Sequence, residues 1–158
     1  MNSLTRKLEV LHQNSGDELI KVAFATTDRR QVNQHFGSAR AIAIYGINRD
    51  NKVLLNVSQF GELGQDGNED KLAIKLESLK GCCAVYCRAC GASGVKQLLA
   101  HGIKPIKVGE GALIEEIVKD LQQEMKRQPS PWLAKAMIQS EGPDDSRFEK
   151  MAAEGWVD

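Results

Sequence analysis

Two cysteines and one histidine are the side chains of this sequence best suited to chemistry. Cys87 and Cys90 stand at C-x-x-C spacing within residues 81–94, a stretch that holds all four cysteines of the chain. Soft sulfur ligands next to free backbone N–H groups suit a metal or metal–sulfur ligand, a redox pair or an activated thiol. His35 lies in a polar loop, after Asn33 and Gln34. These residues leave all three chemistries open.

The other two cysteines do not complete a structural zinc site, which needs four ligands. Cys82 and Cys83 are adjacent in an apolar run that is typical of a strand. Neighbouring side chains of a strand point to opposite faces, and free cysteine is among the residue types most often buried. We therefore expect both to fill the core.

Charged residues flank the same two loops. Arg29, Arg30, Arg40 and Arg88 form either a solvated rim or a set of cations that neutralises an anionic ligand such as a metal–sulfide cluster. Asp28 is expected to turn the chain. A Cys-His hydrolase needs a partner that orients the histidine, and the sequence offers no obvious one.

Hydrophobic patterning predicts five strands, at 19–25, 41–47, 52–60, 82–87 and 103–108. Amphipathic helices are predicted after the third, fourth and fifth strands, the clearest of them over 114–125. The order β-β-β-α-β-α-β-α indicates an α/β fold with a mixed five-stranded sheet flanked by helices. The second and third strands should form an antiparallel hairpin, and the later strands should be parallel, with right-handed crossovers.

This topology brings the two loops together. Ligands of such sheets bind beyond the carboxyl ends of the parallel strands. The first strand is followed by residues 28–37 and the fourth by residues 87–93. If those strands are neighbours, both loops lie over one site.

The domain organisation follows from the same patterning. Residues 1–18 are predicted to be a flexible arm, 19–127 the α/β domain, and 128–158 a tail with a short helix near 132–138. The 158 residues balance 21 Lys+Arg against 21 Asp+Glu, with 5% aromatics, which disfavours nucleic-acid binding. No apolar run approaches membrane-spanning length. With no secretory leader apparent, we expect a cytoplasmic protein with reduced thiols.

Several motifs together resemble one family. The segment from Asp28 through Asn33-Gln34-His35-Phe36-Gly37 resembles a motif of the dinitrogenase iron–molybdenum-cofactor-binding family. Residues 85–92, 62–72 and 151–156 are similar to segments of the same family. The resemblance extends from about residue 20 to residue 156.

The resemblance implies a cofactor carrier and not an enzyme, with a single ribonuclease-H-like domain. Such a protein would bind the iron–sulfur precursor of the nitrogenase iron–molybdenum cofactor as cargo and pass it to a scaffold complex, with the precursor-making enzyme as a second partner. A monomer or weak dimer is expected. The family implicates the histidine of the motif, here His35, and we add Cys87 and Cys90 as metal ligands. The expected cofactor contacts are His35, Arg29, Arg40, Arg88 and Ser93.

Two alternatives compete with a carrier. A thiol–disulfide redox protein would use Cys87 and Cys90, and turnover at a thioredoxin-like potential would support it. A regulatory interaction module would keep its partner when His35 and every cysteine are replaced.

Overall fold

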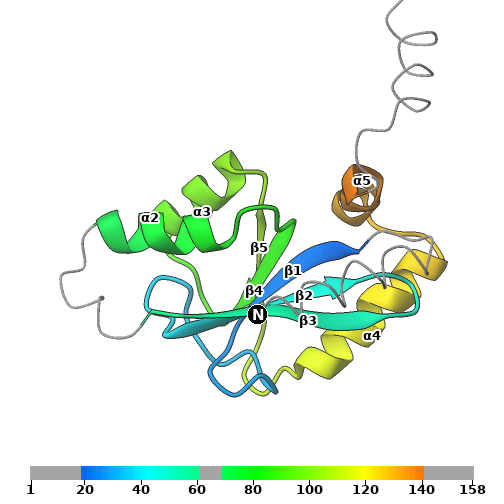
Figure 1. The fold of residues 1–158 in the computed structure, drawn as a ribbon, viewed down its shortest axis with the longest axis horizontal. Coiled ribbons are helices and arrows are strands. Elements are labelled where there is room, and N and C mark those ends of the chain that lie inside the picture. The colour runs from blue at the N-terminus through cyan, green and yellow to red at the C-terminus, as the bar shows by residue number, and fades with distance from the viewer. Residues whose placement is uncertain (1–18, 61–68, 141–158) are drawn as a thin grey trace, which may run out of the picture.

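A computed structural model of the chain describes residues 19–60 and 69–140. The predicted order of five strands and three helices is confirmed, and a further helix follows (Figure 1). The elements are β1 (Ile20–Ala25), β2 (Ala41–Ile47), β3 (Lys52–Gln59), α2 (Glu69–Ser78), β4 (Ala84–Cys87), α3 (Ala92–Ala100), β5 (Lys104–Lys107), α4 (Ile114–Lys126) and α5 (Pro131–Ser140).

The sheet is mixed and has the order β3-β2-β1-β4-β5. Strand β2 is antiparallel to both β1 and β3, and β4 is parallel to both β1 and β5. The predicted hairpin of β2 and β3 is confirmed. Its turn is held by the Asn48 side chain, whose Oδ1 accepts the N–H groups of Asp50 at 2.9 Å and Asn51 at 2.7 Å. Strands β1 and β4 are neighbours, as a shared site for the two loops requires.

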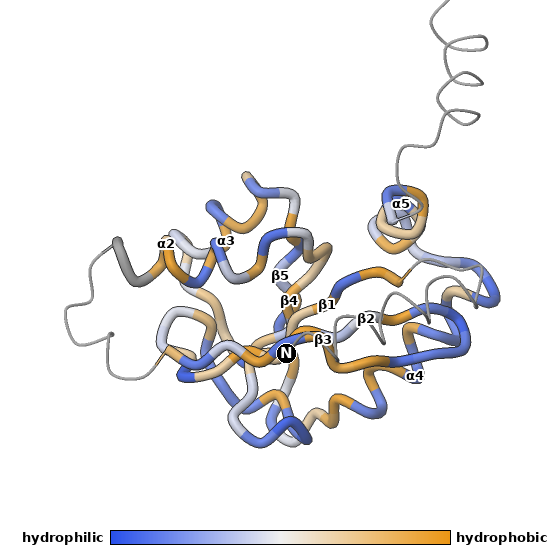
Figure 2. The backbone as a smooth tube through the Cα atoms, viewed as in Figure 1, coloured by the Kyte–Doolittle hydropathy of each residue, from blue (hydrophilic) through white to orange (hydrophobic). Residues whose placement is uncertain are grey.

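Helices cover both faces of the sheet, with α2 and α3 on one side and α4 and α5 on the other (Figure 1). Because side chains of a strand alternate between faces, β1 contributes Val22 and Phe24 to the α4/α5 layer and Ala23 and Ala25 to the α2/α3 layer. Hydrophobic residues predominate along the central strands of the sheet, and hydrophilic residues gather in the turns (Figure 2).

Helix α5 packs on the sheet. Its Leu133 is fully buried and Ala136 is nearly so, in the same cluster as Val22. The short helix predicted near 132–138 is thus present, and it belongs to the core. The domain boundary at residue 127 stays a prediction, and the predicted arm 1–18 and tail residues 141–158 lie outside the described residues.

The fourth and fifth strands are shorter than predicted. Cys82 and Cys83 precede β4, because the Cys82 N–H donates to the Leu79 carbonyl at 2.9 Å and closes the turn after α2. Even so, Cys82 is buried in the α2/α3 layer and Cys83 packs against the α4/α5 layer. Their expected projection to opposite faces is confirmed.

None of the helices within residues 19–60 and 69–140 is long and apolar enough to cross a membrane.

Candidate functional site

The loop after β1 and the turn after β4 are joined by backbone hydrogen bonds. The Phe36 N–H donates to the Ala89 carbonyl and the Arg88 N–H to the Gln34 carbonyl, each at 2.8 Å. His35 is thereby paired with Ala89, between the two cysteines of the C-x-x-C turn. The expectation that both loops lie at one edge of the sheet is confirmed.

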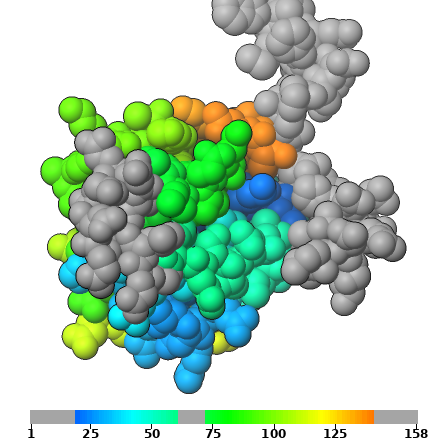
Figure 3. All heavy atoms as spheres, turned by 60° about the vertical axis from the view of Figure 1, so that its left-hand side comes forward, coloured from blue at the N-terminus to red at the C-terminus, as the bar shows by residue number. Residues whose placement is uncertain are grey.

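A third segment, between β5 and α4, holds the other side of the histidine loop. The Val32 N–H donates to the Ala112 carbonyl at 3.0 Å, and the Ile114 N–H donates to the Arg30 carbonyl at 2.9 Å. Gln31 and Leu113 pair as an isolated antiparallel bridge. The loop is therefore fixed along most of its length, and its atoms form one end of the molecule (Figure 3).

The turn that begins the loop is built on Asp28, as predicted. Its carboxylate accepts the N–H groups of Arg30 at 2.8 Å and Gln31 at 3.0 Å, and the Thr26 hydroxyl at 3.1 Å. The hydrogen bond from Gln31, followed by that from Arg30, holds the pKa of Asp28 below its ordinary value. Arg29 takes the left-handed conformation, φ 60°, and its N–H donates to Thr26 Oγ1 at 3.0 Å.

The two amide side chains of the motif shape the loop. Asn33 and Thr27 bond reciprocally, through Thr27 N–H to Asn33 Oδ1 and Asn33 Nδ2 to Thr27 Oγ1, both at 3.1 Å. The Gln34 carbonyl oxygen Oε1 accepts the Arg40 N–H at 3.1 Å. His35, between Gln34 and the buried Phe36, is exposed. The loop thus presents the imidazole while its neighbours serve as structural anchors.

Lys75 of α2 is an anchor that the sequence analysis missed. Its side chain is almost fully buried, with Nζ donating to the Gly37 carbonyl at 2.7 Å and lying 5.3 Å from the centre of the Phe60 ring. Lys75 falls three residues after Leu72 and four before Leu79, so it occupies the apolar stripe of the helix. A lysine within the apolar stripe of the helix was the feature of the sequence that could have indicated a buried anchor.

The cysteines of the turn face the interior. Cys87 is fully buried, and burial, then the neighbouring Cys90 thiol, raises its pKa to about 11. Cys90 is half-buried, and a Cβ placed on Gly94 would stand 2.9 Å from its sulfur. Burial raises the pKa of Cys90 as well. Burial thus favours the neutral form of both thiols.

The predicted cationic rim is distributed around the loops. Arg29, Arg30 and Arg40 are exposed and Arg88 is half-buried. Burial raises the pKa of Tyr45, and the charge of Arg29 partly offsets that rise. The Arg88 Nε is buried without a hydrogen-bond partner in the described part of the chain.

The start of α3 completes the site. Ser93 is exposed in the first turn, and the N-cap residue is Gly91, which has no side chain to cap the first N–H groups. The first N–H groups of a helix have no partner within the helix, and its dipole favours an anion there. Across residues 19–60 and 69–140, no three His, Cys, Asp or Glu side chains are grouped so as to hold a metal ion.

Comparison with known proteins identifies the family. The sequence model described as dinitrogenase iron–molybdenum cofactor matches residues 18–124, which include both loops. The chain belongs to the dinitrogenase iron–molybdenum cofactor family. This membership bears out the resemblance inferred from the motifs.

Relatives named NifX are similar over most of their length. NifX of Azotobacter vinelandii is 58% identical over 156 residues, covering 99% of each chain. NifX of Herbaspirillum seropedicae is 39% identical over 122 residues, covering 77% of this chain and 84% of the relative. A protein of Rhizobium leguminosarum bv. trifolii named FeMo cofactor biosynthesis protein NifB is 29% identical over 104 residues, covering 65% of this chain and 21% of the relative.

Proposed function

We propose that this chain acts in iron–molybdenum cofactor biosynthesis by binding the iron–sulfur precursor of that cofactor as cargo and passing it to the scaffold complex. Its family and its NifX and NifB relatives support this pathway. The observation that carries the proposal is the exposed His35, fixed at the junction of two loops over the carboxyl ends of β1 and β4. The enzyme that makes the precursor would be the donor.

The loop is built to hold His35 before cargo arrives. The bonds of Phe36 to Ala89 and of Arg88 to Gln34 flank the histidine on both sides. Because these backbone atoms are already ordered, binding does not require the loop to lose conformational freedom. His35 is therefore the primary cargo ligand in this proposal.

The sparse ligand set suits a preassembled cluster better than a single metal ion. A cluster brings its own sulfides, so the protein needs only one or two replaceable ligands, whereas a bound ion needs three or four. The exposed arginines and the first turn of α3 supply positive potential for an anionic cluster. Few protein ligands would also permit release to an acceptor.

We assign the two cysteines unequal roles. The half-buried Cys90 is the second candidate ligand, since its sulfur is nearer the surface than that of Cys87. Ligation by the fully buried Cys87 would require the turn to open.

A thiol–disulfide function is less well supported. The attacking species in such chemistry is the thiolate. With its pKa raised to about 11, Cys87 would be ionised in only about one molecule in ten thousand at pH 7. We therefore propose a binding protein and not an enzyme.

We also assign the fold to the ribonuclease-H-like class, on the basis of its β3-β2-β1-β4-β5 sheet order.

Anaerobic titration of the purified chain with isolated cofactor precursor tests the proposal. Visible absorption and iron analysis would follow binding to the native chain, His35→Ala and Cys90→Ser. His101→Ala is the matched control, since His101 is also exposed but lies at the far end of α3, with Nδ1 2.8 Å from the Gln97 carbonyl. We expect stoichiometric binding that weakens at least about tenfold in His35→Ala, less in Cys90→Ser and not in His101→Ala. Failure of the native chain to bind would overturn the carrier function.

A further inference from the structure

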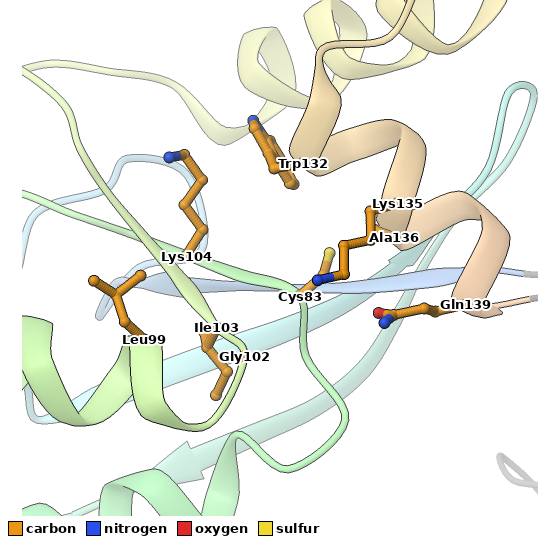
Figure 4. Close-up of a pocket in the computed structure, with 9 residues that line it drawn as sticks. All are labelled: Cys83, Leu99, Gly102, Ile103, Lys104, Trp132, Lys135, Ala136 and Gln139. Atoms are coloured by element: carbon orange, nitrogen blue, oxygen red, sulfur yellow. The ribbon is translucent and has the colours of Figure 1, made fainter.

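A groove lies between α5 on one side and the α3–β5 junction, the start of β1 and the turn before β4 on the other, at the opposite end of the sheet from His35. Two adjoining cavities of about 300 Å³ and 310 Å³ form it, and Cys83, Gly102, Ala136 and Gln139 line both. Figure 4 shows side chains from α3, β5 and α5 around the Cys83 thiol. Each volume is at the lower end of the range for ligand pockets. Nothing in the cofactor site accounts for this groove.

The groove combines an apolar surface with positive charge. Leu99 is 57% exposed on its rim, and Trp132 is half-buried beside it. Among the described residues, the side chains lining the two cavities include three lysines and no carboxylate. These lysines are Lys21, Lys104 and Lys135. Such a surface suits an acidic segment with apolar side chains.

The chain carries such a segment immediately after the groove. Residues 141–158 contain six acidic and two basic residues, a net charge of −4, together with Phe148, Met151 and Trp156. Because the whole chain is neutral, the remaining residues carry +4. The segment begins after Ser140, which itself lines the second cavity.

The segment can reach the whole groove. Trp132 lies eight residues before Ser140 on α5, a distance of about 12 Å along a helix. The eight residues from Ser140 to Phe148 span up to about 27 Å when extended. Because the segment is tethered, its effective concentration is of order millimolar. Weak contacts are therefore enough to populate a docked state.

We propose that residues 141–158 dock in this groove, with their apolar side chains against Leu99 and Trp132 and their carboxylates beside Lys104 and Lys135. This contact between residues 141–158 and the groove is intramolecular and lies at the end of the sheet remote from the cargo loops. It is independent of whether the chain carries a cofactor precursor.

Fluorescence of Trp132 provides a direct test in the full-length chain. The sequence has two tryptophans, so Trp156→Phe leaves Trp132 as the only reporter. In that background we expect the charge-reversed chain Asp144→Lys/Asp145→Lys/Glu149→Lys to expose Trp132, with acrylamide quenching rising about twofold and the emission moving to the red. Raising the salt concentration to 0.5 M should act in the same direction, because it screens the lysine–carboxylate attraction.

Matched substitutions in the groove give the control. Lys104→Glu should release the segment and raise quenching, whereas Lys107→Glu, an exposed lysine of the same strand that lines neither cavity, should not. Combining Lys104→Glu with the reversed segment should restore the shielding. Alkylation of Cys83, followed by peptide mapping, should accelerate severalfold on release.

Three results would overturn the proposal. The first is equal quenching of Trp132 in the native-charge and charge-reversed chains. The second is an equal effect of Lys104→Glu and Lys107→Glu on that quenching. The third is a shielding of Trp132 from acrylamide that grows with protein concentration. The last result would assign the groove to the segment of a second copy.

Discussion

The histidine loop and the cysteine turn meet at one edge of the sheet, yet they present their reactive atoms in opposite directions. His35 is exposed, whereas Cys87 is fully buried and Cys90 is half-buried with its sulfur toward Gly94. By residue type the C-x-x-C turn was the first candidate and the histidine loop the second. The difference teaches that residue type and C-x-x-C spacing do not reveal which of these side chains is exposed to solvent.

The sharpest contrast lies between two neighbours in the loop. Phe36 is fully buried, so Phe36→Ala should lower the free energy of unfolding by about 3–5 kcal/mol. His35→Ala should change it by no more than about 0.5 kcal/mol, because the side chain is exposed. Urea denaturation measures both. Equal losses would mean that His35 is a structural residue and not one held free for a ligand.

Packing beneath the cysteine turn gives the next effect. In Gly94→Ala the new methyl group meets Cys90 Sγ at 2.9 Å and Phe36 Cδ2 at 3.4 Å, and we expect a net loss of about 1 kcal/mol. Removing the sulfur with Cys90→Ala should reverse the sign, since alanine then gains its helix propensity over glycine, up to about 1 kcal/mol. Gly37→Ala is the control, because a Cβ added at Gly37 would meet no atom within 4 Å. A Gly94→Ala loss that persists without the sulfur would contradict the inward orientation of Cys90.

Alkaline pH should lower the free energy of unfolding through the buried Cys87 thiol. Burial raises the pKa of Cys87 from 9.0 to about 11, so the unfolded chain ionises first and loses its proton to solvent. The resulting stability is complete below pH 9 and is lost as pH rises through about 11, with a slope of up to about 1.4 kcal/mol per pH unit for this thiol. Urea denaturation at pH 9 and pH 10 should show a loss about 1 kcal/mol smaller in Cys87→Ala. Equal losses would place Cys87 in contact with solvent.

The smallest effect on stability is expected from the exposed carboxylate of Asp28. The pKa of Asp28 is lowered by backbone hydrogen bonds, so its stabilising charge is present above its ordinary pKa of 3.8 and lost as pH falls below it. Because the carboxylate is exposed, Asp28→Asn should cost less than about 1 kcal/mol at pH 7, and the cost should vanish at strongly acidic pH. Thermal unfolding at the two pH values measures this. A cost that is independent of pH would mean that shape, and not charge, holds the turn.

Patterning predicted the framework of the molecule well. The β2–β3 hairpin was predicted from its short turn, which is a local feature of the sequence. The meeting of the two loops was predicted on the condition that β1 and β4 are neighbours, and the structure meets that condition. The strand from Cys82 was predicted too long, since the bond from Cys82 N–H to Leu79 fixes the turn and no sequence pattern records it.

Orientation and burial were harder to predict. That Cys90 faces Gly94 depends on the angle at which α3 leaves the turn, and that Lys75 reaches Gly37 depends on how α2 packs over the loop. Both depend on tertiary packing, which the local sequence does not determine. The lysine in the apolar stripe of α2 was visible in the sequence, but its carbonyl partner, 38 residues away, was not.

Direct detection of an iron–imidazole bond tests the central claim that His35 ligates the cargo. The chain has three histidines, so uniform ¹⁵N-imidazole labelling combined with single His→Ala variants can assign a signal. Pulsed electron paramagnetic resonance of the precursor-loaded chain, with the cluster in a paramagnetic state, should show nitrogen coupling. If His35 is the ligand, His35→Ala abolishes this coupling and His101→Ala preserves it. Nitrogen coupling that survives in His35→Ala, or its absence from the fully loaded native chain, would show that His35 does not ligate the cargo.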